Sequence, residues 1–139
     1  NNSTLVDDLW KFDGSDWKQL RDIADNDSDE DYDDDYAITR AGTVSFVIDG
    51  RGYIATGTRS GVTSDYWVYD PEEDLWYGDS DDDYTPMTNV HNVSSGGSSR
   101  SYAVSFSTGK RGFVLSGSSG TSYFDDVYEL LPYEQEDVD

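Results

Sequence analysis

An internal repeat constrains this chain more than any other feature. Val44-Ser45-Phe46 recurs 60 positions later (104 − 44) as Val104-Ser105-Phe106. Further pairs at the same offset are Arg40/Arg100, Gly52/Gly112, Tyr53/Phe113, Gly57/Gly117 and Asp65/Asp125. Glycines, aromatic residues and an aspartate align together, which indicates one structural unit used more than once and stacked on its neighbours.

A second series begins earlier in the chain. The segment 8–13, Asp-Leu-Trp-Lys-Phe-Asp, matches 65–70, Asp-Tyr-Trp-Val-Tyr-Asp, at an offset of 57 (65 − 8). Each segment is followed by a further tryptophan, Trp17 in the first and Trp76 in the second. The chain therefore contains the end of one unit, one full unit and part of a third.

Within a unit the pattern is that of β-strands. Residues 43–48 form a β-branched and aromatic run, and Asp49-Gly50-Arg51-Gly52 is a hairpin turn signal. The returning strand covers 53–58, a third strand alternates over 65–70, and a fourth begins at 75–77. The second copy predicts strands at 103–107, 112–116 and 124–131 but has no obvious fourth strand. No useful helical periodicity is present, so we expect an all-β fold of four-stranded antiparallel units.

These motifs resemble the kelch-repeat family of β-propellers, whose architecture galactose oxidase shares. The resemblance lies in the glycine that ends the second strand (Gly57, Gly117), the third-strand pattern Asp-x-[Trp/Tyr]-x-[Tyr/Phe]-Asp and the fourth-strand tryptophan. Only one glycine of the family's double glycine is kept, in Thr56-Gly57 and Ser116-Gly117. The chain also looks like the extracytoplasmic kelch proteins of Bacteroidetes, which implies an extracytoplasmic, bacterial-type location.

The resemblance implies about two and a half blades. The expected division is 1–24 as the end of one blade, 25–39 as an acidic insert, 40–78 as a full blade, 79–99 as an acidic and Ser/Gly-rich insert, and 100–139 as a partial blade. Closed propellers have about four to eight blades. We therefore expect other blades or other chains to complete the ring. Trp10, Trp67 and Tyr128 should occupy one point of successive third strands, and Trp17 and Trp76 should bury between sheets; a sugar-binding aromatic platform is the alternative.

The net charge is −21, from 30 acidic and 9 basic residues. Such a surface disfavours nucleic acids and anionic lipids and favours cations or basic partners. Most of the charge lies in two runs that both end in Asp-Asp-Asp-Tyr. Alternating carboxylates can bind Ca²⁺, and the candidate ligands are Asp27, Asp29, Asp31, Asp33, Asp35, Asp79, Asp81 and Asp83. Because the EF-hand pattern is not met, solvated acidic loops remain an alternative, as does pairing of these carboxylates with Arg40 and Arg100.

The sequence indicates no complete catalytic set. There is no cysteine, and His91 is the only histidine, so neither a thiolate nucleophile nor the copper chemistry of galactose oxidase can be built from this chain alone. No segment has the roughly 20 apolar residues of a membrane span. We expect a non-catalytic module that binds a protein or a glycan and possesses no cofactor other than Ca²⁺. The alternative is a segment of a sugar-processing propeller enzyme whose site lies in other blades or another chain.

Overall fold

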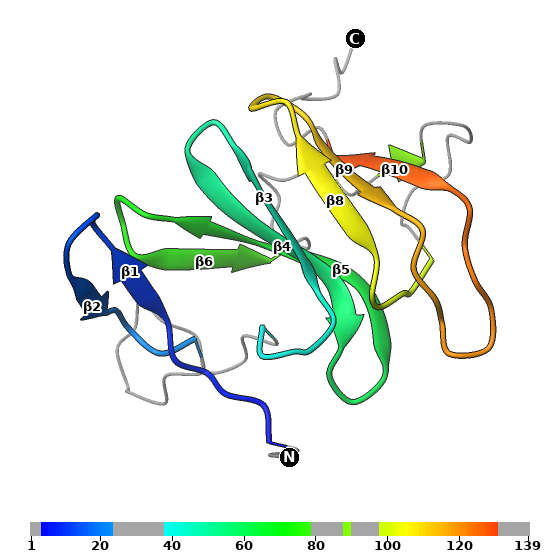
Figure 1. Ribbon diagram of the computed structural model, residues 1–139, viewed down its shortest axis with the longest axis horizontal. Coiled ribbons are helices and arrows are strands. Elements are labelled where there is room, and N and C mark those ends of the chain that lie inside the picture. The colour runs from blue at the N-terminus through cyan, green and yellow to red at the C-terminus, as the bar shows by residue number, and fades with distance from the viewer. Residues whose placement is uncertain (1–3, 24–37, 79–87, 90–97, 131–139) are drawn as a thin grey trace, which may run out of the picture.

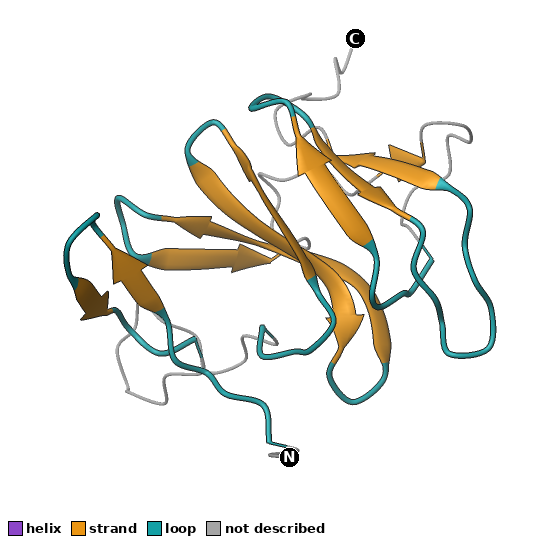
Figure 2. Ribbon diagram, viewed as in Figure 1, coloured by secondary structure: helices purple, strands orange, loops and turns teal. Residues whose placement is uncertain are grey.

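The computed structural model describes residues 4–23, 38–78, 88–89 and 98–130. This part of the chain is all-β, with antiparallel sheets and no helix, which confirms the all-β, antiparallel part of the expectation (Figures 1 and 2). No helix within the described ranges could therefore span a membrane. The strands are β1 (Trp10–Phe12), β2 (Trp17–Gln19), β3 (Val44–Ile48), β4 (Arg51–Thr58), β5 (Val62–Asp70), β6 (Leu75–Gly78), β7 (Thr88–Asn89), β8 (Val104–Ser107), β9 (Gly112–Leu115) and β10 (Val127–Leu130).

The strands form three sheets. The N-terminal sheet is the hairpin β1–β2, the central sheet has the order β3-β4-β5-β6, and the C-terminal sheet has the order β7-β10-β9-β8. Figure 1 shows them side by side in chain order. We call the face of a sheet that looks toward the C-terminal end of this row its forward face. The face that looks toward the N-terminal end of the row is its rear face.

The central sheet follows the predicted alternation. Val44, Phe46 and Ile48 of β3 point to one side and are buried, whereas the residues between them are exposed. Asp49 and Gly50 connect β3 to β4 with φ angles of 48° and 80°. Two consecutive residues with positive φ are the requirement of a type I′ hairpin turn, and this explains why the sequence has Asp-Gly here.

Two cores hold the three sheets together. The larger one lies between the forward face of the central sheet and the rear face of the C-terminal sheet, and it comprises Val44, Phe46, Ile48, Tyr53, Ala55, Tyr66, Val68, Val114 and Leu130. The smaller one lies between the N-terminal and central sheets and is built on Ile38 and Trp76. Apolar residues on both faces of the central sheet are thus removed from water, as a sheet between two others requires.

Three expectations need correction. The fourth-strand position of the C-terminal sheet is filled by β7, which precedes β8 in the chain and pairs with β10 through Tyr128↔Asn89. Trp17 is not buried between sheets: it is 65% exposed, because no described residue covers the rear face of the N-terminal hairpin. The partner that repeats Asp65 is Asp126 rather than Asp125, because the loop before β10 is one residue longer than the one before the same point of β5.

Candidate functional site

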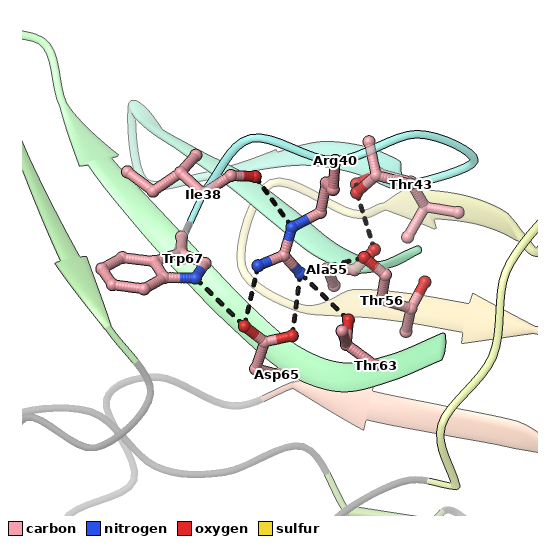
Figure 3. A network of polar contacts seen from close by, with 9 residues as sticks. Ile38, Arg40, Thr43, Ala55, Thr56, Thr63, Asp65 and Trp67 are labelled. Carbon is pink, nitrogen blue, oxygen red and sulfur yellow. Dashed lines mark hydrogen bonds and ion pairs between the residues drawn. The ribbon is translucent and has the colours of Figure 1, made fainter. Parts of the chain in front are cut away.

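A buried arginine joins the start of the central sheet to its third strand (Figure 3). The Arg40 guanidinium donates two hydrogen bonds to the carboxylate of Asp65, at 2.8 and 2.7 Å. It also donates to the backbone carbonyls of Ile38 and Thr56, each at 2.9 Å. The Arg40 side chain is only 1% exposed. A planar guanidinium suits this arrangement because it can bind a carboxylate with two parallel bonds while it donates to carbonyls beside it.

Asp65 receives a further hydrogen bond from its own strand. The indole N–H of Trp67 donates to the Asp65 carboxylate at 3.1 Å. Burial raises the pKa of Asp65, but hydrogen bonds from Arg40, Thr63 and Trp67, together with the Arg40 charge, outweigh it, so that the pKa lies below its ordinary value. The carboxylate is therefore held in its charged form. The Asp-x-Trp pattern thus has a direct structural role in the clamp.

The C-terminal sheet repeats this clamp. Arg100 donates to both oxygens of Asp126, at 2.5 and 3.0 Å, and to the carbonyl of Ser116 at 2.7 Å. Its guanidinium lies over the rings of Phe124 and Tyr128, at 4.4 and 4.8 Å from their centroids. Hydrogen bonding to Arg100 lowers the pKa of Asp126 from its ordinary value. Tyr128 occupies the place that Trp67 has in the central sheet, so a cation–π contact replaces the indole hydrogen bond.

The N-terminal hairpin has the acidic half of the same arrangement. The indole N–H of Trp10 donates to Asp8 at 2.7 Å, as Trp67 does to Asp65. Within the described ranges no arginine contacts Asp8, which is exposed. The Asp-x-Trp contact therefore forms even where the arginine clamp is absent.

The two clamps fix equivalent points of the chain. Arg40 follows the first acidic run within a few residues, and Arg100 follows the second insert in the same way. Each clamp thus fastens the segment that leaves an insert to the third strand of the sheet that follows. The sequence proposed the carboxylates of the inserts as partners of these arginines, and those carboxylates lie outside the described residues. The partners that the structure describes are Asp65, on the third strand, and Asp126, directly before it.

The candidate calcium ligands lie outside the described residues. This holds for both runs of aspartates, 27–35 and 79–83, and for His91. Among the residues that are described, no group of three or more His, Cys, Asp or Glu side chains is close enough to hold a metal ion. The calcium site therefore stays a prediction.

A cavity of about 590 Å³ lies between the N-terminal hairpin and the turn that joins β5 to β6. Its volume is within the range of small-ligand sites. Charged and apolar side chains share its lining, which comprises Leu9, Trp10, Lys11, Asp13, Asp16, Lys18, Leu20, Tyr69, Pro71 and Asp74. Backbone N–H groups of Asp16 and Ser15 lower the pKa of Asp13, so this carboxyl is a stable anion. Sequence reasoning missed this cavity, because its walls come from segments 49 positions apart in the chain (69 − 20).

Two exposed tyrosines line a shallow depression on the C-terminal sheet. Tyr102 is 78% exposed and Tyr123 is 92% exposed, and Ser116, Gly117 and Phe124 are among the other residues of the depression. Tyr102 has a φ of 55°, where the equivalent residue of the central sheet is Gly42 with a φ of 64°. A tyrosine in this conformation is strained, and its ring lies against Gly42, whose added Cβ would come within 3.2 Å of it.

The carboxyls with a clearly shifted pKa, among the described residues, are all shifted downward: Asp13, Asp65, Asp70 and Asp126. A general acid of the glycosidase type needs a carboxyl with a raised pKa. The resolved geometry thus offers anchored anions and exposed aromatic rings. No protein-family model matches the chain, and no curated protein sequence matches it either.

Proposed function

We propose that the chain is a non-catalytic binding module made of kelch-type propeller blades, which presents its two acidic inserts on one face for recognition of a protein or a glycan. The observation that carries the proposal is the repeated clamp, Arg40 with Asp65 and Arg100 with Asp126. Two buried arginines fasten the exits of two acidic inserts at equivalent points. A stack of sheets then presents both inserts in a fixed relation to each other.

The blade interpretation is supported by the order of strands. The central sheet has four antiparallel strands in sequential order, as in a propeller blade. All three sheets have the Asp-x-[Trp/Tyr] pattern at the same point. The indoles of Trp10 and Trp67 donate to Asp8 and Asp65. In the C-terminal sheet the Tyr128 ring instead lies against the Arg100 guanidinium, which binds Asp126. We propose that further blades complete the propeller.

Calcium binding by the inserts is part of the proposal. With a net charge of −21, dense carboxylates repel one another unless a cation lies between them. Hard divalent cations prefer six to eight oxygen ligands, which alternating aspartates can provide. An extracytoplasmic location, as in the kelch proteins that the chain resembles, would suit a calcium-dependent loop face.

The second candidate is a segment of a sugar-processing propeller enzyme. The observation in its favour is the cavity beside Trp10, which has an aromatic wall and three carboxyls, those of Asp13, Asp16 and Asp74. The lowered pKa of Asp13 suits an electrostatic or ligand-binding role and does not suit proton donation. For this reason we prefer the binding module.

Calorimetry with CaCl₂ tests the proposal. We expect a saturable heat for the 139-residue chain and a rise in melting temperature, because Ca²⁺ would bind the folded state alone. The variant Asp31→Asn/Asp33→Asn/Asp35→Asn should lose both effects. A control with the same loss of charge at exposed positions, Asp7→Asn/Glu72→Gln/Asp125→Asn, should keep them. If the chain gives no heat up to millimolar Ca²⁺, or if the control variant loses the effects equally, calcium recognition by the inserts is wrong.

The recognition step is tested on an array of neutral glycans, with and without Ca²⁺. We expect binding that requires Ca²⁺ and that is lost in the triple variant of residues 31, 33 and 35. Hydrolysis of a glycan by the chain would instead support the enzyme. Binding that is lost on replacing Tyr102 or Tyr123 but not the aspartates would place recognition on the aromatic depression and contradict the acidic face.

A further inference from the structure

The forward faces of the central and C-terminal sheets have the same apolar residues but differ in exposure. Val44 and Phe46 on β3 are 5% and 7% exposed. Their equivalents on β8, Val104 and Phe106, are 60% and 50% exposed. The aromatic partner across the hairpin is retained too, because Phe106 stacks on Phe113 at 4.5 Å as Phe46 stacks on Tyr53 at 5.6 Å. The forward face that is buried as core in the central sheet is thus exposed in the C-terminal sheet.

The structure shows what covers such a face. The rear of the C-terminal sheet packs on the central sheet, and Gly112 is placed so closely on the Phe46 ring that an added Cβ would overlap with it. Ser105 donates its hydroxyl to the carbonyl of Ser45 at 2.9 Å, and Ser107 donates to the carbonyl of Val47. A forward face therefore receives the rear face of another sheet of this repeat.

The N-terminal sheet has an open rear face. Phe12 and Trp17 lie opposite each other in the hairpin, with ring centroids 4.9 Å apart. They repeat Tyr69 and Trp76 of the central sheet, which lie opposite each other at 5.1 Å. Trp76 is 5% exposed and packs in the core with Ile38, next to Leu9 and Ile23 at the base of the N-terminal hairpin. Trp17 is 65% exposed and Phe12 is 51% exposed.

From these two faces we infer that copies of this chain associate head to tail, the forward face of one C-terminal sheet on the rear face of the next copy's N-terminal hairpin. In both interfaces within the chain a forward face meets a rear face. Phe106, on β8, marks the open forward face and Trp17, on β2, the open rear face, and their two sheets lie at opposite ends of the row (Figure 1). A second copy therefore supplies the missing complement for each. The contact is heterologous, so it closes into a ring when the rotation permits and otherwise continues as a filament.

The charge of the chain predicts how salt affects this association. Each copy has a net charge of −21, so two copies repel each other at low ionic strength. The proposed contact itself is apolar at Val104, Phe106, Phe12 and Trp17. Added salt should therefore strengthen the association, because it screens the repulsion over about 10 Å at 0.1 M without weakening apolar contact.

Sedimentation of two single variants, alone and mixed, tests the inference. Phe106→Glu places a charge in the apolar forward face, and Trp17→Glu places one in the apolar rear face. Both positions are exposed in the single chain, so each variant should still fold, and circular dichroism checks this. Each variant alone should be monomeric at a concentration where the parent chain associates. Their equimolar mixture should form a heterodimer, because each supplies the intact face that the other lacks. Val47→Glu, at a 56% exposed position on β3 of the central sheet and so outside both faces, is the matched control and should associate like the parent chain.

Three results would overturn the inference. A folded parent chain that stays monomeric at high micromolar concentration and in added salt would show that no second copy binds these faces. Self-association of Trp17→Glu alone would indicate contact between two forward faces. Failure of the mixed variants to pair, although each is folded, would exclude the head-to-tail arrangement. The measurement is made without Ca²⁺, so its outcome is independent of the proposed acidic face.

Discussion

The backbone N–H of Gly57 donates to the carbonyl of Arg100 at 2.8 Å and so joins the central sheet to the C-terminal one. The guanidinium of Arg100 stays within its own sheet, on Asp126. One residue thus fixes both the internal clamp of a sheet and the contact with the sheet before it. Gly57 itself is constrained from within its own sheet, because an added Cβ would meet the backbone of Ala41 and Thr43.

We expect Gly57→Ala to lower the free energy of unfolding by at least about 2 kcal/mol. Gly57 has a φ of 104°, and an added Cβ would lie 2.8 Å from the carbonyl oxygen of Ala41. The matched control is Gly50→Ala, whose φ of 80° is also unfavourable but whose added Cβ meets nothing within 4 Å. Chemical denaturation should show a smaller loss for the control. Equal losses would mean that backbone strain alone, and not close approach, explains the glycine.

Two neighbouring aspartates give a sharp test of the clamp. Asp126→Asn should cost roughly 2–4 kcal/mol of stability, because it leaves the guanidinium of Arg100, 1% exposed, without its counter-charge. Asp125→Asn, one position earlier and exposed, should change stability by less than about 0.5 kcal/mol. Urea unfolding of both variants measures the difference. A larger effect at Asp125 would restore the register that the sequence offset of 60 suggested.

The sequence predicted the regular part of the fold well. Val44-Ser45-Phe46 alternates in the way a half-buried strand requires, and Asp49-Gly50 has the chemistry of its hairpin turn. Such local signals depend only on neighbouring residues, so they can be interpreted without tertiary contacts. The repeat also located the two arginines at equivalent points, although not their partners.

What could not be predicted depends on insertion length and on contacts between distant segments. The loop before Asp126 is one residue longer than its counterpart, and a constant offset conceals such an insertion. β7 pairs with β10 from about 40 positions earlier (128 − 89), and its two residues have no recognisable strand pattern. Trp17 and Trp76 have the same sequence context, yet Trp76 is 5% exposed and packs with Ile38, whereas Trp17 is 65% exposed.

These two tryptophans should therefore respond differently to truncation. Trp76→Ala should cost about 3–5 kcal/mol, because the ring is 5% exposed and packs against Ile38 and Tyr69. Trp17→Ala should cost about 1 kcal/mol or less in the monomeric chain, since its ring is 65% exposed. Thermal unfolding at low concentration and low salt keeps association out of the comparison. If the two losses were equal in the monomer, the rear face of the hairpin would have to be covered by another part of the chain.

The clamps also predict how stability depends on pH. The pKa values of Asp65 and Asp126 are below the ordinary 3.8 in the folded state, because Arg40 and Arg100 bind the charged form. A carboxyl with a depressed folded pKa contributes stability that is fully present above its unfolded pKa and is lost as pH falls through the folded value. The parent chain should therefore lose this contribution progressively below about pH 4.

The double variant Asp65→Asn/Asp126→Asn should be less stable at neutral pH yet lose less stability on acidification. Urea midpoints at pH 7 and pH 3 measure this, with Asp7→Asn/Asp125→Asn as the exposed control that keeps the parent's full loss. Protonation of the other carboxyls relieves the repulsion within a chain of charge −21 and acts in the opposite direction. For this reason the comparison is between variants at each pH, and an identical acid loss in parent and double variant would contradict the role of the clamps.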